Sequence, residues 1–265
     1  MFSVLSSFLS ENLFLFSVFL VVMSFALSYT SLPLVIYVSV VKNLTASPNN
    51  RSSHVKSTPH LGGLSIALSM FFVCSLMSGL VLSHEHLKIL MAICTSLVIL
   101  FFTGLKDDIV GISPVKKLFA EILASYLFIF FSDIRIDSFH GILFIDEIPL
   151  IVSYAFTIFV FVIIINSFNL IDGIDGLASS IAIIISSFFS YYFYINDSYL
   201  GLMLSLSLIG SLLAFLRYNI SSGKLKIFMG DVGSLIVGFV LAVMSVMVLS
   251  TNYLVLNTSV LVKWN

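Results

Sequence analysis

The chain has 265 residues, of which 59% are hydrophobic and only 9% are charged. Soluble domains carry about 25% charged residues, so this composition excludes an ordinary soluble protein. The net charge of −1 gives no support for a nucleic-acid partner. Cys74 and Cys94 lie in apolar runs without a CxxC spacing, a pattern typical of buried thiols rather than of a disulfide framework.

Long apolar runs dominate the sequence. Runs of about 17–25 apolar residues can cross a bilayer as helices, and none of those found here alternates in polarity as a membrane β-barrel strand does. The first run is also too long for the apolar segment of a cleaved signal peptide. We therefore predict an all-α, polytopic integral membrane protein with about eight transmembrane helices and a single domain over residues 1–265. The predicted helices lie at about 13–41, 61–83, 87–104, 115–132, 149–167, 177–195, 199–216 and 233–251.

Eight helices divide the loops between two sides of the membrane, and the basic residues divide unequally. Lys88, Arg135 and Lys263 fall on the side that holds the N-terminus, and the other nine of the 12 Lys and Arg residues fall on the opposite side. Because basic residues accumulate in cytoplasmic loops, we expect this second side to be cytoplasmic and the N-terminus to lie outside.

The first of four polar segments on the predicted cytoplasmic side covers residues 51–63. Lys56 precedes Pro59 and the glycine Gly62, at which the second helix is expected to begin. A lysine in this position can reach an anion held at a helix N-terminus. Taken alone, the segment is explained better as an ordinary basic loop.

The second segment, 104–114, contains the adjacent carboxylates Asp107 and Asp108. At a membrane interface such a pair is repulsive and poorly hydrated, so a divalent cation or a strong hydrogen-bond donor is expected to offset the cost. The alternative, a solvated acidic turn, is weakened by the small number of charges that the chain carries anywhere.

In the third segment, polar residues recur every three positions, which places them on one face of a helical turn. This face could line a polar pocket. Packing between helices would also tolerate the amides, but carboxylates are poor contacts between membrane helices. The four residues are Asn166, Asn169, Asp172 and Asp175.

The fourth segment places Asp231 between Gly230 and Gly233, at the expected start of the last helix. Glycine allows a close approach of the backbone to a ligand, and the positive end of the helix dipole points to the same place. Asp231 suits a hard, oxygen-preferring metal. Phe228 could stack on a planar base, although aromatic residues at membrane edges are common.

One further acid, Glu121, lies inside a predicted helix. It follows Lys117 by one helical turn, and we expect the two to form a structural ion pair at the membrane edge.

All four segments fall on one side by a topology assigned without reference to their motifs, which favours a single site. Its carboxylates, amides, lysine and helix N-termini suit phosphate chemistry with Mg²⁺, which binds through one or two carboxylates and substrate phosphates. No GxxxxGKS or GxxxxGKT string is present, so hydrolysis of nucleotides by a P-loop is not supported. No Cys/His cluster suggests zinc.

Two strings give the sequence a recognisable likeness, NxxNxxDGxDGL at 166–177 and FMGDxGS at 228–234. With the other segments in the same order, they resemble the polyprenyl-phosphate N-acetylhexosamine-1-phosphate transferase family, which includes the bacterial undecaprenyl-phosphate GlcNAc-1-phosphate transferases and phospho-MurNAc-pentapeptide transferase. The resemblance implies that a lipid phosphate attacks the sugar-bound phosphorus of a UDP-sugar. UMP is then released and a lipid-linked sugar pyrophosphate forms.

The resemblance also implies roles for individual residues. One of Asp107 and Asp108 would be the base that deprotonates the lipid phosphate, and Asp231 would bind Mg²⁺, with Mn²⁺ as the alternative ion. Lys56 would lie near the donor phosphates and Phe228 against uracil. The substrate-binding residues implied are Lys56, Asn166, Asn169, Asp172, Asp175, Asn219 and Phe228.

The same resemblance implies a setting. The protein would be a multi-pass enzyme of the bacterial inner membrane with a cytoplasmic active site, in contact with membrane lipids and compatible with a homodimer. Its partners would be polyprenyl phosphate and a UDP-N-acetylhexosamine, in the first membrane step of cell-envelope polysaccharide synthesis. The identity of the sugar and the receiving pathway stay open.

The sequence departs from the family pattern in two places. Asn219 is followed by Ile-Ser-Ser-Gly-Lys-Leu instead of a Pro-Ala segment, and the chain ends at Asn265, where family members continue into a histidine-rich loop. The domain is therefore expected to lack the family's C-terminal part, and the alternative function is that of a truncated inactive homologue or membrane scaffold. An intramembrane prenyltransferase is disfavoured because NDxxDxxxD strings are absent. A transporter is disfavoured because the acids cluster at one edge rather than near the bilayer midplane.

Overall fold

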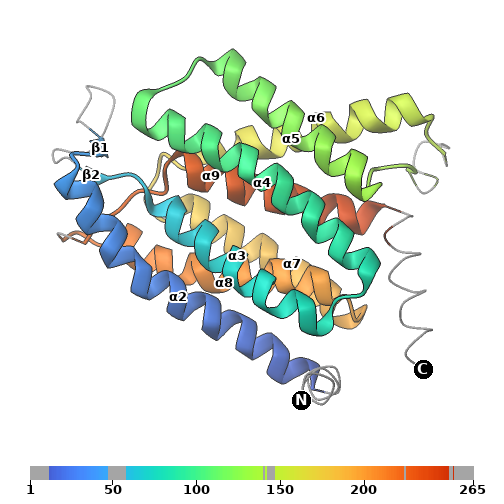
Figure 1. The fold of residues 1–265 in the computed structure, drawn as a ribbon, viewed down its shortest axis with the longest axis horizontal. Helices are drawn as coiled ribbons and strands as arrows, with labels where there is room; N and C mark the ends of the chain where they lie inside the picture. The colour runs from blue at the N-terminus through green and yellow to red at the C-terminus, as the bar shows by residue number, and fades with distance from the viewer. Residues whose placement is uncertain are drawn as a thin grey trace.

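The computed structural model describes residues 12–46, 58–139, 141, 147–223, 225–250 and 253. These residues form a bundle of long helices, shown in Figure 1, beside one short antiparallel pairing of β1 (Thr45–Ala46) with β2 (Thr58–Pro59). The prediction of an all-α protein is confirmed. The helices are α2 (Leu13–Val41), α3 (Gly62–Val81), α4 (His84–Val110), α5 (Pro114–Ser132), α6 (Leu150–Ile171), α7 (Leu177–Ile195), α8 (Tyr199–Asn219) and α9 (Gly230–Leu249).

Each predicted helix range overlaps one observed helix, but several ends that carry polar residues extend farther than hydropathy indicates. Helix α4 continues through the Asp107–Asp108 pair, α6 continues to Ile171, and α9 begins three residues earlier than expected, at Gly230. Hydropathy locates only the part of a helix that needs an apolar environment, whereas backbone hydrogen bonding can continue into polar sequence. The polar segments are therefore largely helix ends rather than loops.

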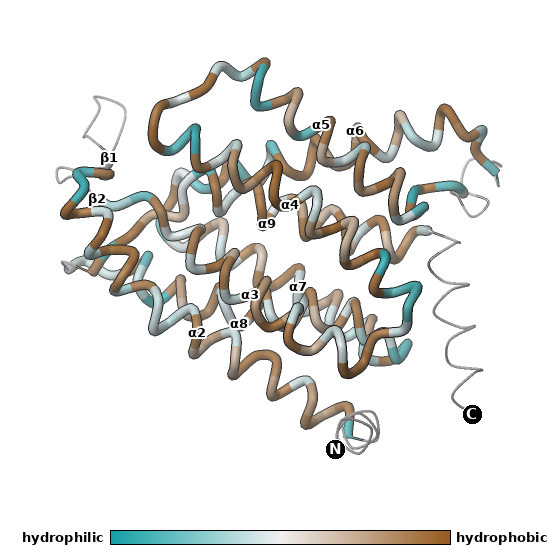
Figure 2. The backbone as a smooth tube through the Cα atoms, viewed as in Figure 1, coloured by the Kyte–Doolittle hydropathy of each residue, from teal (hydrophilic) through white to brown (hydrophobic). Residues whose placement is uncertain are grey.

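Seven of the helices in the described part are long and apolar enough to cross a membrane, one fewer than predicted. The exception is α5, whose first eight residues include Lys116, Lys117 and Glu121. Many large apolar side chains point outward, such as Ile151 at 84% and Phe188 at 74% exposure, and Figure 2 shows apolar residues along the lengths of the helices. This surface suits lipid rather than water, as expected for a multi-pass membrane protein.

Consecutive helices run in opposite directions through the bundle (Figure 1). The C-terminal ends of α4, α6 and α8 therefore meet the N-terminal ends of α5, α7 and α9 at one end of the molecule, which we call the acidic end. Helix α9 lies inside the bundle with almost all of its side chains buried, and it packs against α3, α4 and α6.

Glycines allow the neighbouring helices to approach the α9 backbone. A Cβ atom on Gly63 would lie 2.1 Å from the Gly233 nitrogen, and one on Gly104 would lie 2.6 Å from the Cα atom of Val232. Small residues at such crossings are the usual means of close packing between membrane helices, where no hydrophobic force drives helices together. The start of α9 is thus fixed from two sides by backbone contacts.

We expect Gly63→Ala to lower the midpoint of thermal unfolding in detergent by about 5 °C or more, because the added methyl group overpacks the α3–α9 crossing. Gly79→Ala in the same helix is the matched control, since its Cβ would meet nothing within 4 Å. Alanine is also the better helix former there, so its midpoint should stay unchanged or rise slightly. Equal effects of the two substitutions would contradict this packing.

Candidate active site

Asp108, near the C-terminal end of α4, binds the N-terminal end of α9. Its Oδ1 accepts a hydrogen bond from the Asp231 backbone N–H (2.9 Å) and its Oδ2 accepts one from the Val232 N–H (3.1 Å). The first N–H groups of a helix have no partner within the helix and carry the positive end of its dipole. Asp108 therefore caps α9 from a neighbouring helix.

The chain leading into α3 holds the chain leading into α9. The Phe228 N–H donates to the Pro59 carbonyl oxygen (2.8 Å), and the Gly62 N–H donates to the Phe228 carbonyl oxygen (2.9 Å). At the first residue of α9, Gly230 has a φ of 73°, and a Cβ atom on it would lie 1.9 Å from the His60 carbonyl oxygen. Only glycine fits this position, both by backbone conformation and by space.

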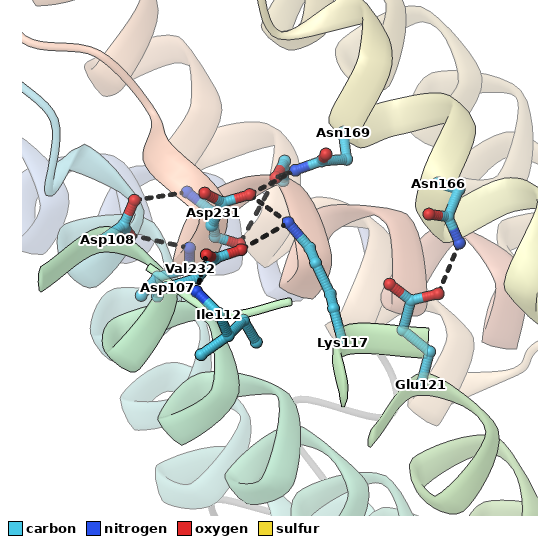
Figure 3. A network of polar contacts seen from close by, with 10 residues as sticks. Asp107, Asp108, Ile112, Lys117, Glu121, Asn166, Asn169, Asp231 and Val232 are labelled. Carbon is cyan, nitrogen blue, oxygen red and sulfur yellow. Dashed lines mark hydrogen bonds and ion pairs between the residues drawn. The ribbon is translucent and has the colours of Figure 1, made fainter. Parts of the chain in front are cut away.

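Lys117, near the start of α5, bridges Asp107 and Asp231. Its Nζ atom donates to Asp107 Oδ2 (3.0 Å) and to Asp231 Oδ1, and Figure 3 shows the bridge. The second oxygen of Asp107 accepts the Ile112 backbone N–H (2.9 Å). The lysine and Asp107 side chains are 14% and 15% exposed, so water screens this ion pair only in part.

Asn169 on α6 completes the surroundings of Asp231. Its Nδ2 atom donates to Asp231 Oδ1 (2.6 Å) and lies 2.8 Å from Ser234 Oγ. An amide and an ammonium group thus share one carboxylate oxygen, which fixes the orientation of Asp231 toward the α4–α5 side of the cluster.

The expected Lys117–Glu121 ion pair is wrong. Lys117 binds Asp107 and Asp231 instead, and Glu121 Oε2 accepts from Asn166 Nδ2 (2.5 Å). Spacing along a helix allows the predicted pair, but two carboxylates on neighbouring helices attract the ammonium group more strongly than one. Sequence reasoning consequently missed Lys117 as a site residue. Its only signal was a basic residue in the first turn of a predicted helix.

The polar stripe predicted at 166–175 divides in the structure. Asn169 and Asp172 lie at the Asp108–Asp231 cluster, whereas Asn166 faces Glu121. Asp175 accepts from Lys226 Nζ (2.5 Å) on the other flank. Two of the four residues are therefore brought to the start of α9.

Asp172 follows the last residue of α6 and is half-buried beside like charges. Burial and the nearby carboxylates of Asp231 and Asp108 raise its pKa to about 8, although a hydrogen bond from the Gly230 backbone N–H acts in the opposite direction. Three carboxylates in one partly buried place favour the binding of a cation or a proton.

The remaining predicted residues lie beside this cluster. The Phe228 ring is half-buried, with Lys226 Nζ 5.4 Å from its centroid. Asn219 is 5% exposed, and both ends of its amide bind backbone, with Oδ1 accepting from Gly176 N–H (2.6 Å) and Nδ2 donating to the Ile227 carbonyl oxygen (2.9 Å). Asn219 thus holds the loops around the site together. Lys56 lies outside the described residues, and its role stays a prediction.

The residues fit a magnesium ion whose coordination shell is completed by substrate oxygens. Among the described residues, no three His, Cys, Asp or Glu side chains converge to hold a metal on their own. Two carboxylate oxygens do converge on one cation, since Asp107 Oδ2 and Asp231 Oδ1 bind the same ammonium group. One or two carboxylates plus substrate phosphates are the usual protein environment of Mg²⁺.

Comparison with known proteins gives the same indication as this geometry. Residues 89–249 match the family model described as glycosyl transferase family 4. The chain belongs to glycosyl transferase family 4. The matched region runs from α4 to α9 and contains every described site residue from Asp107 to Asp231.

Individual family 4 relatives match over most of the chain. Phospho-N-acetylmuramoyl-pentapeptide-transferase of Clostridium botulinum is 31% identical over 242 residues, which cover 83% of this chain and 70% of the relative. The Enterococcus faecalis protein of the same name is 32% identical over 248 residues, covering 85% and 74%. A probable undecaprenyl-phosphate N-acetylglucosaminyl 1-phosphate transferase of Bacillus subtilis is 31% identical over 217 residues, covering 81% and 58%. The family resemblance indicated by the motifs is confirmed.

We expect Asp108→Asn to destabilise the family 4 chain by about 1–3 kcal/mol, because an amide can accept from only one of the two α9 N–H groups and turns a donor toward the other. The measurement is thermal unfolding in detergent. Asp175→Asn is the control, since its partly exposed pair with Lys226 contributes little. Equal unfolding midpoints for Asp108→Asn and the unsubstituted chain would contradict the cap.

The raised pKa of Asp172 predicts a pH dependence of stability in the absence of divalent cations. The folded protein holds a proton on Asp172 that the unfolded chain, with the ordinary value of 3.8, has released. Stability should therefore decrease as pH rises from about 4 to about 8 and then level off. Unfolding midpoints across this range should fall less steeply for Asp172→Asn, and equal slopes would contradict the assignment.

Proposed function

We propose that this family 4 chain transfers an N-acetylhexosamine-1-phosphate from a UDP-sugar to polyprenyl phosphate, giving a lipid-linked sugar pyrophosphate and UMP. Family membership and the names of the relatives support the reaction class. The observation that carries the proposal is the meeting of Asp107, Lys117 and Asp231 at the N-terminal end of α9. This arrangement offers oxygen ligands and a cation in one place, as phosphoryl transfer requires.

In the proposed reaction, an oxygen of the lipid phosphate forms a bond to the sugar-bound phosphorus of the donor. The bond from that phosphorus to the bridging oxygen breaks, and the electron pair leaves with UMP. Any proton on the attacking oxygen passes to Asp107. We prefer Asp107 to Asp108 as the base because both Asp108 oxygens are held by backbone N–H groups of α9, whereas one Asp107 oxygen is bound by the flexible Lys117 side chain.

Asp231 would hold Mg²⁺, or Mn²⁺ in its place, and the bound ion would supply positive charge to offset the negative charge of the pyrophosphate. Asn169 keeps Asp231 in position through its hydrogen bond. On the other flank, Phe228 would pack against uracil, and Lys56 would approach the donor phosphates. Asn219 supports this flank through the two loops that it joins.

A lipid acceptor suits the surface around the acidic end. Val110, Val115 and Leu170 flank the aspartates and are 75%, 76% and 80% exposed. An apolar cavity of about 250 Å³ lies between α3, α4 and α9, lined by residues such as Phe71 and Phe101. A substrate with a charged head and an isoprenoid tail matches a polar site beside such apolar surfaces.

We also propose the bacterial inner membrane as the location, with the acidic end in the cytoplasm and the N-terminus outside. The unequal distribution of basic residues supports this orientation. A homodimer and a place in the first membrane step of envelope polysaccharide synthesis stay predictions from the resemblance. Relatives named for two different sugars match at 31% identity, so both donor types belong in the assay.

The test uses purified protein with Mg²⁺, undecaprenyl phosphate and UDP-GlcNAc, UDP-GalNAc or UDP-MurNAc-pentapeptide. We expect UMP release that requires the lipid. Asp107→Asn and Asp231→Asn should lower the rate by about 100-fold or more, the usual contribution of a positioned base or charge.

Asp197→Asn is the control, because Asp197 lies between α7 and α8 at the opposite end of the bundle and its left-handed backbone (φ 48°) also suits asparagine. Its rate should equal that of the unsubstituted protein. No turnover with any donor would favour an inactive homologue instead, and full activity of Asp231→Asn would overturn the proposed site.

A further inference from the structure

Glu121 is a buried acid that the proposed reaction does not use. Its side chain is 0% exposed, and it projects from α5 within the bundle. One carboxylate oxygen accepts from Asn166 (2.5 Å), and the other, Oε1, has no hydrogen-bond partner in the part of the chain that the structure describes. A buried carboxylate oxygen without a hydrogen-bond partner lowers the stability of the folded protein, which suggests that Glu121 has another role.

The nearest flexible cation stands on the same helix. Lys117 precedes Glu121 by four residues, a spacing at which helical side chains meet, and Figure 3 shows the two side chains rising from α5 in different directions. Lys117 is directed to Asp107 and Asp231, and Glu121 is directed to Asn166. Because Lys117 and Glu121 lie on the same helix, rotation of the four-carbon lysine side chain would carry the ammonium group from the aspartates to Glu121 without movement of α5.

The present position of the ammonium group conflicts with metal binding. Lys117 Nζ binds Asp107 Oδ2 and Asp231 Oδ1. Under the proposed function, Asp231 would hold a divalent cation and Asp107 would accept the proton of the lipid phosphate. A divalent cation and an ammonium group at the same oxygens repel each other strongly in a partly buried site. Lys117 must therefore leave these oxygens, at least in part, for the metal to bind.

We propose that Glu121 is the alternative partner of Lys117, a positioning residue that receives the ammonium group when a divalent cation binds at Asp231. The unpaired Oε1 atom is satisfied in that state, and Asp107 Oδ2 becomes free to contact the metal or the lipid phosphate. Without the Glu121 carboxylate, the lysine competes with the metal and lowers its affinity. This inference rests on the proposed metal site and adds to it the residue that makes room for the ion.

The test measures Mn²⁺ binding to the purified full chain by electron paramagnetic resonance of the free ion, with no substrate and no turnover. Glu121→Gln keeps the size of the side chain and an acceptor for Asn166. We expect it to raise the Mn²⁺ dissociation constant about tenfold, and Glu121→Asp to restore most of the affinity. Glu85→Gln is the matched control, because Glu85 pairs with exposed Lys88 at the opposite end of α4, and its dissociation constant should not change.

A second comparison separates this role from a structural one. In a Lys117→Met background no ammonium group competes with the metal, so Mn²⁺ should bind more tightly, and adding Glu121→Gln should change the affinity little. An equal loss from Glu121→Gln with and without Lys117, or no loss in either, would overturn the proposal. Unfolding midpoints identify any variant that does not fold. If Lys117→Met does not fold, the Mn²⁺ affinities of Glu121→Gln and Glu121→Asp decide whether the Glu121 carboxylate has the proposed role.

The two proposals can fail separately. If the unsubstituted chain and Asp231→Asn bind Mn²⁺ equally, the proposed metal site itself is wrong and the role of Glu121 falls with it. If Asp231→Asn loses Mn²⁺ binding while Glu121→Gln keeps it, only the exchange of partners by Lys117 is wrong.

Discussion

The pair of hydrogen bonds from the first turn of α9 to Asp108 is the interaction on which the rest of the site depends. Helix α9 is almost wholly buried, so the N–H groups at its start need partners that the bilayer cannot supply. Asp108 provides two acceptors from the end of α4. The same contact fixes where Asp231 emerges, since Asp231 is one of the two residues whose N–H groups are bound. The Asp108 carboxylate therefore fixes both the start of α9 and the position of Asp231 in the site.

Concentrating carboxylates at this point has an electrostatic consequence. Asp108, Asp172 and Asp231 lie close enough that burial and mutual repulsion hold the pKa of Asp172 at about 8. Lys117 offsets part of this charge by bridging Asp107 and Asp231. The arrangement attracts cations and holds one on the flexible side chain of Lys117, which suits the proposed binding of a metal ion and of substrate phosphates.

Much of the fold could be predicted from the sequence, because long apolar runs identify helices that face lipid. The site could be predicted in outline from charges at helix boundaries, but its partners could not. Within α6, residues spaced by three differ by about 60° in direction, so Asn166 faces Glu121 while Asn169 reaches Asp231. Asp172 and Asp175 lie in the turn after α6, where helical spacing no longer predicts direction, and Asp175 binds Lys226 instead. The partner of Lys117 was misassigned for a related reason, because spacing along one helix carries no information about its neighbours.

If the acidic end transfers a phosphoryl group together with its sugar, the position of an isotope label in the products will show it. A UDP-sugar labelled with ³²P in the phosphate next to the sugar is incubated with the protein, Mg²⁺ and undecaprenyl phosphate. We expect the label to enter the lipid fraction with the sugar and the released UMP to be unlabelled. Transfer of the sugar with the label left in UDP, or no label in lipid from any donor, would contradict it.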